Sequence, residues 1–186
     1  MSVTKTDIVN AALIRLGANR VNSIDDNNPR ARIMKDLYEI IRKRILEEHR
    51  WSFATGRSEL TKSGTTPDFG YTYYYVLPSD YLYIQSDANG YLYEIEGSLL
   101  LSNENLVQVK YTKDETSPSK FSANFVKAFF LELAMEACYA ITESHILVAS
   151  LRAEKDMVLP MAKSISSQQD DSDIEVEIPD FIDSRF

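Results

Sequence analysis

The chain is poor in the residues that most often form metal and disulfide sites. Its 186 residues include one cysteine and two histidines. With Cys138 alone, no disulfide can form within the chain, and a zinc site built from cysteines would lack partners. Cys138 lies in a helical apolar pattern, where a free cysteine usually behaves as a small core residue. His49 and His145 are far apart, and neither has a carboxylate at metal-ligand spacing. The sequence therefore predicts no metal and no cofactor.

Long apolar runs are also missing. The longest mostly apolar segment, 125–141, is interrupted by three charged residues, which is unsuited to a membrane span. Asp7 and Arg15 interrupt the short apolar run near the N-terminus, which is unlike a signal peptide. We therefore expect a soluble protein that is neither secreted nor bound to a membrane.

Catalytic motifs are absent as well. The sequence contains no G-x-S-x-G, no Gly-rich phosphate loop and no H-E-x-x-H. A carboxylate pair such as Glu47 and Asp80 could form a glycosidase site, but 28 acidic residues make accidental pairs unavoidable. The sequence does not give the carboxylate separation on which that chemistry depends. We predict that the protein is not an enzyme and has no catalytic residues.

The charge of the chain is uneven. The formal net charge is −8, and residues 167–186 contain seven acidic residues and one arginine. The remaining body holds 21 acidic and 19 basic residues, so it is close to neutral. Such a body lacks the broad basic surface of a protein that grips nucleic acid.

Helical periodicity dominates both ends of the body. Apolar residues at four-residue spacing predict a helix over 7–16, capped by Thr6 and stopped by Gly17. A second helix is expected to start at Asn28 with Pro29 in its first turn. Trp51 and Phe53 follow it at strand spacing and should cover one end of the helix pair.

Two further helices are expected after residue 120. Ser122 can cap a long helix with a wide apolar face, and residues 142–144 form a tight turn. A fourth helix should run from His145 to about Ser166, kinked or split at Pro160.

Between these helices the period changes to two, which is typical of strands. Eight of the eleven tyrosines lie between Tyr71 and Tyr93, and tyrosine favours half-buried sheet positions. Asn89-Gly90 predicts a hairpin between 81–86 and 91–96. We expect an antiparallel meander of four or five strands.

The sequence thus predicts an α+β fold in three parts. Residues 1–60 and 113–166 form a bundle of about four helices, and residues 61–112 form the inserted β-meander. Residues 167–186 form a flexible, acidic C-terminal arm. Its alternating residues 174–178 could add a strand to another subunit's sheet, or the arm could fold back on its own meander.

Two surface features have alternative interpretations. The second helix, with Arg42 and Arg44, is the most basic element; a solvated or intersubunit salt-bridged face is favoured over a nucleic-acid reader. The tyrosines could form a stacking platform, but cross-strand pairs or a subunit interface are the simpler interpretation.

The order and spacing of several short motifs resemble one known family. Most of residues 1–166 is covered, although each motif is weak alone. The matching residues are Ala11, Ala12, Leu13, Leu16, Gly17, Ile24, Asp25, Asp26, Arg44, Leu46, His49, Trp51, Phe53, Ala54, Arg57, Leu60, Leu77, Pro78, Ser79 and Asp80. In this pattern the chain resembles the tail tubular protein A family, the head-to-tail adaptors of short-tailed phages.

The resemblance implies a helical core with a β extension and a structural role. Such a subunit would assemble into a homo-oligomeric ring, twelve-fold by resemblance, between the portal protein and the tail nozzle (tail tubular protein B-like). DNA would pass through the lumen during genome ejection without sequence-specific binding. The protein would be found in the virion tail or neck, and in the host cytoplasm during assembly.

Roles are also expected for three surfaces, from their charge and aromatic patterns and, for the arm, from the resemblance. Arg42 and Arg44 are expected at the subunit interface. The arm would bind the portal through five apolar residues: Ile174, Val176, Ile178, Phe181 and Phe186. The nozzle or subunit interface would use five tyrosines: Tyr73, Tyr75, Tyr83, Tyr91 and Tyr93. The alternatives are a virion-associated peptidoglycan hydrolase and a free nucleic-acid-binding regulator.

Overall fold

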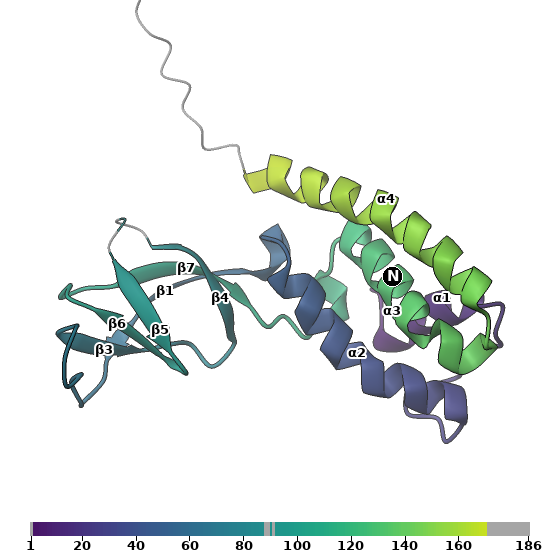
Figure 1. The fold of residues 1–186 in the computed structure, drawn as a ribbon, viewed down its shortest axis with the longest axis horizontal. Helices are drawn as coiled ribbons and strands as arrows, with labels where there is room; N and C mark the ends of the chain where they lie inside the picture. The colour runs from purple at the N-terminus through teal and green to yellow at the C-terminus, as the bar shows by residue number, and fades with distance from the viewer. Residues whose placement is uncertain (1, 88–89, 91, 171–186) are drawn as a thin grey trace, which may run out of the picture.

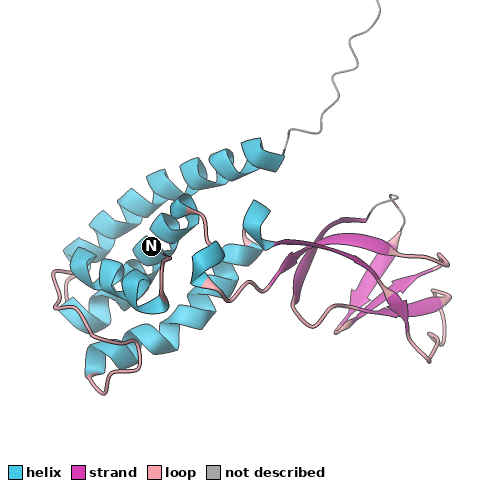
Figure 2. Cartoon of the chain, turned by 180° about the vertical axis from the view of Figure 1, so that it is seen from behind, coloured by secondary structure: helices cyan, strands magenta, loops and turns pink. Residues whose placement is uncertain are grey.

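The computed structural model describes residues 2–87, 90 and 92–170, which form two lobes lying end to end (Figure 1). The helical lobe contains α1 (Lys5–Arg15), α2 (Pro29–Glu47), α3 (Ala123–Thr142) and α4 (His145–Asp170). The sheet lobe is inserted between α2 and α3 and contains the seven strands found in the described residues. The view from behind shows the same separation of helices and strands (Figure 2). The predicted α+β class is confirmed.

Helix α1 begins earlier than the sequence predicted. Thr4, not Thr6, caps it: the Thr4 hydroxyl accepts a hydrogen bond from the Asp7 N–H, and the Asp7 carboxylate accepts one from the Thr4 N–H. This capping box satisfies two backbone donors together, so the helix starts at Lys5. Gly17 follows the helix with φ +66°, the left-handed stop that was expected.

The starts of α2 and α3 confirm the predicted caps. The Asn28 side chain accepts a hydrogen bond from the Ala31 N–H at 2.9 Å, and Ser122 accepts one from the Phe125 N–H at 3.2 Å. Helix α4 differs, because it continues through Pro160 to Asp170 without a break. Pro160 is exposed, so the carbonyl that loses its hydrogen-bond partner can be hydrated instead.

The strands form two antiparallel sheets rather than one meander. The three-stranded sheet has the order β1 (Thr55–Glu59), β7 (Gln108–Lys113), β4 (Tyr81–Asp87). The four-stranded sheet has the order β2 (Thr61–Lys62), β3 (Tyr73–Val76), β6 (Leu99–Ser102), β5 (Tyr93–Glu96). Strand β1 starts at Thr55, within the range assigned to the bundle, so the sheet lobe spans 55–113.

The hairpin predicted around Asn89-Gly90 is wrong. Strand β4 pairs with β7 and β5 pairs with β6, so the strands on either side of this turn belong to different sheets. The tight hairpin forms instead at Gly97-Ser98, between β5 and β6, where Gly97 has φ +60°. Strand β6 is nearly all buried, and its burial decides the pairing.

Each lobe has its own apolar core. The helical lobe buries one face of each helix around Trp51, Phe125 and Phe129, all at 0% exposure. The sheet lobe buries a smaller cluster that includes Tyr75, Leu100 and Tyr111.

Within the described ranges, no helix is long and apolar enough to cross a membrane.

Candidate functional site at the junction of the two lobes

The chain passes between the lobes twice, and the first passage is anchored by Trp51. Its ring is fully buried, and its indole N–H donates a hydrogen bond to the Ile45 carbonyl at 2.8 Å, beside the end of α2. The ring meets Phe125 of α3 edge-on at a centroid distance of 5.0 Å. Residues Ser52–Ala54 form a 3₁₀ turn, so Trp51 and Phe53 are not at the strand spacing that was predicted.

An aromatic cluster extends from this anchor to the second passage. Phe53 and Phe121 lie 5.6 Å apart between ring centroids, and both contact Phe125. Phe53 precedes β1 and Phe121 precedes α3, so this cluster joins the two passages to each other. Aromatic pairs at such distances contribute about 0.5–1.5 kcal/mol each beyond their buried area.

The second passage is held by Arg42 of α2. Its side chain is 1% exposed, and it donates hydrogen bonds to Glu39 at 2.8 Å, to Asp114 at 2.5 Å and to the Glu115 carbonyl at 2.8 Å. Asp114 and Glu115 directly follow β7. Lys43 adds a second contact to Asp114 at 3.3 Å. Arg42 therefore binds the end of the sheet lobe to the middle of α2.

The network favours the charged forms of its members. Partial burial acts to raise the pKa of Asp114, but the hydrogen bond and charge of Arg42, with help from Lys43, outweigh it and hold the pKa below its ordinary value. Burial acts likewise on Glu39, where Lys5 and Arg42 bring the pKa down. Burial would lower the pKa of Arg42, but Asp114 and Glu39 raise it. The junction is a set of mutually stabilising charges.

A third connection involves α4. Arg50 donates a hydrogen bond to the Gln85 carbonyl of β4 at 3.0 Å, and the Ser166 hydroxyl donates to the Arg50 carbonyl at 3.3 Å. Lys163 pairs with Glu48 at 3.2 Å. The C-terminal part of α4 is thus tied to the same segment that leads into the sheet lobe.

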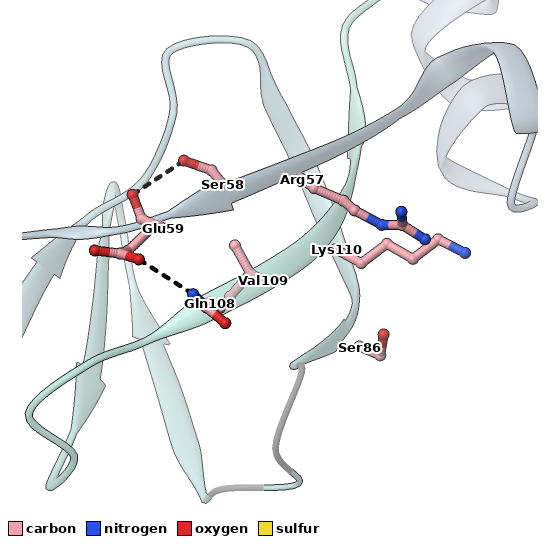
Figure 3. Close-up of a pocket in the computed structure, with 7 residues that line it drawn as sticks. All are labelled: Arg57, Ser58, Glu59, Ser86, Gln108, Val109 and Lys110. Carbon is pink, nitrogen blue, oxygen red and sulfur yellow. Dashed lines mark hydrogen bonds between the residues drawn. The ribbon is translucent and has the colours of Figure 1, made fainter.

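Two adjoining hollows lie beside the junction. The first crosses the face of the three-stranded sheet, where Arg57 of β1 and Lys110 of β7 extend side by side (Figure 3). The second lies between the end of α2, the sheet and Ser167 of α4. Lys110 lines both hollows, so the two adjoin at this side chain. We call this surface the trough; its lining is Arg57, Ser58, Glu59, Ser86, Gln108, Val109, Lys110, Glu47, Glu48, His49, Arg50, Tyr83 and Ser167.

The structure separates the two arginines that were expected at a subunit interface. Arg42 is buried within the chain by its own acidic partners, so that expectation is wrong for Arg42. The sequence did not reveal the buried position of Arg42, because its partner Asp114 is remote from α2 along the chain. The one sequence feature that pointed to a partner was the pair of acidic residues directly after β7. Arg44 is 42% exposed and pairs with Glu132 and Glu136 of α3. Its role at an interface stays a prediction.

The tyrosines also divide. Tyr75 is 1% exposed and donates a hydrogen bond to the Glu104 carbonyl at 2.5 Å, so it is a core residue and the interface expectation is wrong for it. Tyr73, Tyr83 and Tyr93 are half-buried and stay predictions for the nozzle or subunit interface. Tyr91 lies outside the described residues.

The predicted portal-binding residues of the arm, Ile174 to Phe186, also lie outside the described residues.

The two carboxylates considered as a glycosidase pair, Glu47 and Asp80, lie in different surroundings. Glu47 is at the end of α2 and lines the trough, whereas Asp80 accepts a hydrogen bond from the Tyr111 hydroxyl at 3.1 Å. Cys138 is buried, as expected for a core residue.

Within the part of the chain that the structure describes, no group of three or more His, Cys, Asp or Glu side chains could hold a metal ion. The junction consists of aromatic packing, one buried arginine and the trough. No protein-family model and no curated protein matches this chain.

Proposed function

We propose that this chain is a structural adaptor subunit that assembles with copies of itself into a ring between a phage portal and a tail nozzle. The observation that carries the proposal is the junction. Both passages between the lobes are fixed, by Trp51 and by Arg42, so one subunit can hold two differently built surfaces in a constant relation. A connector that transmits position between two larger rings needs that property.

The outer face of α4 supports self-association. Ile146, Met157 and Met161 are 86%, 77% and 67% exposed. They recur at helical spacing, and the exposed positions between them include Ala149, Ala153 and Pro160. An apolar stripe on a helix that is exposed in a single copy is suited to packing against another subunit. Contacts between unlike faces close into a ring when the rotation allows it.

The sheet lobe and the arm supply the remaining roles of the proposal. The sheet lobe projects away from the bundle (Figure 1) and carries exposed Phe69 and Leu92, so it would meet the nozzle. The arm, residues 167–186, would contact the portal through its apolar residues, which all lie beyond the end of α4 at Asp170. DNA would pass the lumen without being gripped, in keeping with the acidic charge of the chain.

Electron microscopy of the chain mixed with a purified portal tests the proposal. We expect a ring of added density on the portal. The double variant Met157→Glu and Met161→Glu should abolish the ring without unfolding the subunit, because it places charges on the α4 stripe. Phe69→Glu, on the sheet lobe, is the matched control and should leave the ring intact. A chain that stays monomeric and has no affinity for the portal would overturn the proposal.

A further inference from the structure

The helical lobe presents two of its helices on opposite sides. Helix α4 runs along the top of the lobe in Figure 1, and the N-terminal half of α2 runs along the bottom, with α1 and α3 between them. Helix α1 bridges the two, because Lys5 pairs with Glu39 of α2 and Arg15 pairs with Glu154 of α4. The outer faces of α2 and α4 therefore cannot meet within one chain, but they can meet between copies.

The two helices run in the same direction. Along one side of α3, Glu132 pairs with both Arg44 of α2 and Lys155 of α4. Further along, Glu48 at the end of α2 pairs with Lys163 of α4. Residue numbers thus rise together on α2 and α4. Neighbours in a ring of many copies differ by a small rotation, so α4 of one copy would meet α2 of the next copy in a nearly parallel orientation.

The exposed face of α4 carries a hollow. Its lining comes from this helix alone: His145, Val148, Ala149, Arg152, Ala153 and Asp156. Ala149 and Ala153 are both exposed and lie about one turn apart, so an apolar side chain of a second helix can pack between them. The hollow is therefore suited to receiving a protruding side chain.

The outer face of α2 offers a side chain of that kind. Ile40 is 65% exposed, and it continues a helical stripe that starts with the half-buried Ile33 and Leu37. On α4, Ile146 and Ala153 have the same separation along the helix as Ile33 and Ile40 have on α2. A parallel register that places Ile40 beside Ala153 therefore also places Ile33 beside Ile146.

Charges next to the two stripes match in the same register. Arg44 lies one turn beyond Ile40, and Asp156 lies nearly one turn beyond Ala153, so the two charges would be close across the contact. Arg44 pairs with α3 in its own chain, yet it stays 42% exposed. In the described ranges, Asp156 forms only a 4.0 Å ion pair with the adjacent Lys155. Opposite charges of this kind favour one partner and one register.

We propose that α4 of one copy packs in parallel against α2 of the next copy, with Ile40 inserted between Ala149 and Ala153 and with Arg44 beside Asp156. The occupant of the hollow on α4 is thus a second copy of this chain. The contact joins unlike faces, so it can repeat from copy to copy around a ring. It rests on the proposed function, to which it adds the face of the neighbour that α4 contacts.

Cysteine cross-linking on the portal tests this contact. In a Cys138→Ala background, chains with Ile40→Cys are mixed with chains with Ala153→Cys, assembled on the purified portal and treated with a short bis-maleimide. We expect covalent dimers from the mixture and none from either chain alone, because the contact joins unlike faces. A chain with both substitutions should give a ladder of higher oligomers. Both positions are exposed, and far-UV circular dichroism checks that each variant is folded.

A second pair of positions tests the orientation. Ile33→Cys should cross-link with Ile146→Cys, but not with Met161→Cys, which lies about 22 Å further along α4. Asp156→Lys should lower the yield of both expected cross-links several-fold, because it places like charges beside Arg44. Glu96→Lys, an exposed change on β5, is the matched control and should leave the yields unchanged.

The outcomes separate this contact from the proposed function. Rings on the portal without either expected cross-link would overturn the contact and leave the adaptor role intact. Cross-linking of the Ala153→Cys chain to itself would also overturn the contact, since α4 would then pack against α4. So would a product of Ile33→Cys with Met161→Cys, which requires an antiparallel orientation. A chain that stays monomeric in the presence of the portal would overturn both proposals.

Discussion

The helical lobe and the sheet lobe differ most in how much interior they have. Among the described residues, the helical core contains 24 buried apolar residues and the core of the sheet lobe contains seven. Two small sheets with so few buried residues gain little from burial. We therefore expect the helical lobe to be stable by itself and the sheet lobe to depend on the two passages that join it to the helices. The variants below test that dependence.

Trp51→Ala should have the largest effect. It removes the ring at the first passage, opens a cavity against Phe125 and loses the hydrogen bond to the Ile45 carbonyl. Replacing a buried tryptophan by alanine costs about 3–5 kcal/mol. Urea unfolding followed by far-UV circular dichroism measures the loss. Phe69→Ala, at an 88% exposed position, is the control and should change nothing. Equal effects of the two would refute the assigned role of Trp51.

Arg42→Leu should weaken the second passage. It leaves Asp114 and Glu39 without their shared partner, and breaking a buried ion pair costs about 3 kcal/mol at the lower end of the usual range. Trp51 fluorescence reports the unfolding of the helical lobe. The tyrosine signal in near-UV circular dichroism reports mainly the sheet lobe, because nine of the eleven tyrosines lie between Tyr71 and Tyr111. The tyrosine transition should move to lower urea than the tryptophan transition.

The control for Arg42 is on the same helix. Lys43→Leu removes an exposed cation that also contacts Asp114, at 3.3 Å, and an exposed pair contributes about 0–1 kcal/mol. Its two transitions should stay together. If the transitions of Arg42→Leu also coincide, the sheet lobe does not depend on this passage.

Gly56→Ala should affect the sheet lobe alone. A Cβ at this position would lie 2.7 Å from the ring of Tyr111, which is buried and hydrogen-bonded to Asp80. Overpacking of this kind costs about 1–3 kcal/mol. The near-UV signal of the tyrosines should unfold earlier, with the Trp51 transition unchanged. Gly64→Ala meets nothing within 4 Å and should leave both signals as they are.

Acid should loosen the junction before either core. The pKa values of Asp114 and Glu39 are lowered in the folded chain, from ordinary values of 3.8 and 4.5. Their stabilisation is therefore complete above the unfolded pKa values and is lost as the pH falls through the folded ones. Asp114→Asn should be less stable than the parent chain near neutral pH. The difference in urea midpoint should shrink as the pH falls from about 6 to about 3; a constant difference would contradict this.

The sequence predicted the helical lobe better than the sheet lobe, for a physical reason. Helices are set by contacts within a few residues, so Asn28, Ser122 and Gly17 were enough to place three helix ends. Strand partners are chosen by burial between distant segments. The local signal at Asn89-Gly90 was therefore overruled by the pairing of β5 with the buried β6.

The junction shows the same limit. Trp51 could be recognised as an anchor from its place after a charged helix, and it is one. Arg42 was expected to face outward because its helix carries many charges, yet its partner Asp114 is 72 residues away. Nothing in the spacing of α2 reveals a partner so remote. The trough was missed for the same reason, since Arg57 and Lys110 meet only through the β1–β7 pairing.

The smallest effect is expected at Tyr38, inside the larger core. Its hydroxyl is buried and, within the described residues, has no hydrogen-bond partner; burial also raises the pKa of Tyr38. An unpaired buried hydroxyl costs free energy that its removal recovers. Tyr38→Phe keeps the ring contact with Phe129 and should leave stability unchanged or raise it by up to about 1 kcal/mol. A marked loss of stability in urea unfolding would mean that the Tyr38 hydroxyl has a hydrogen-bond partner, as the hydroxyls of Tyr75 and Tyr111 in the sheet lobe do.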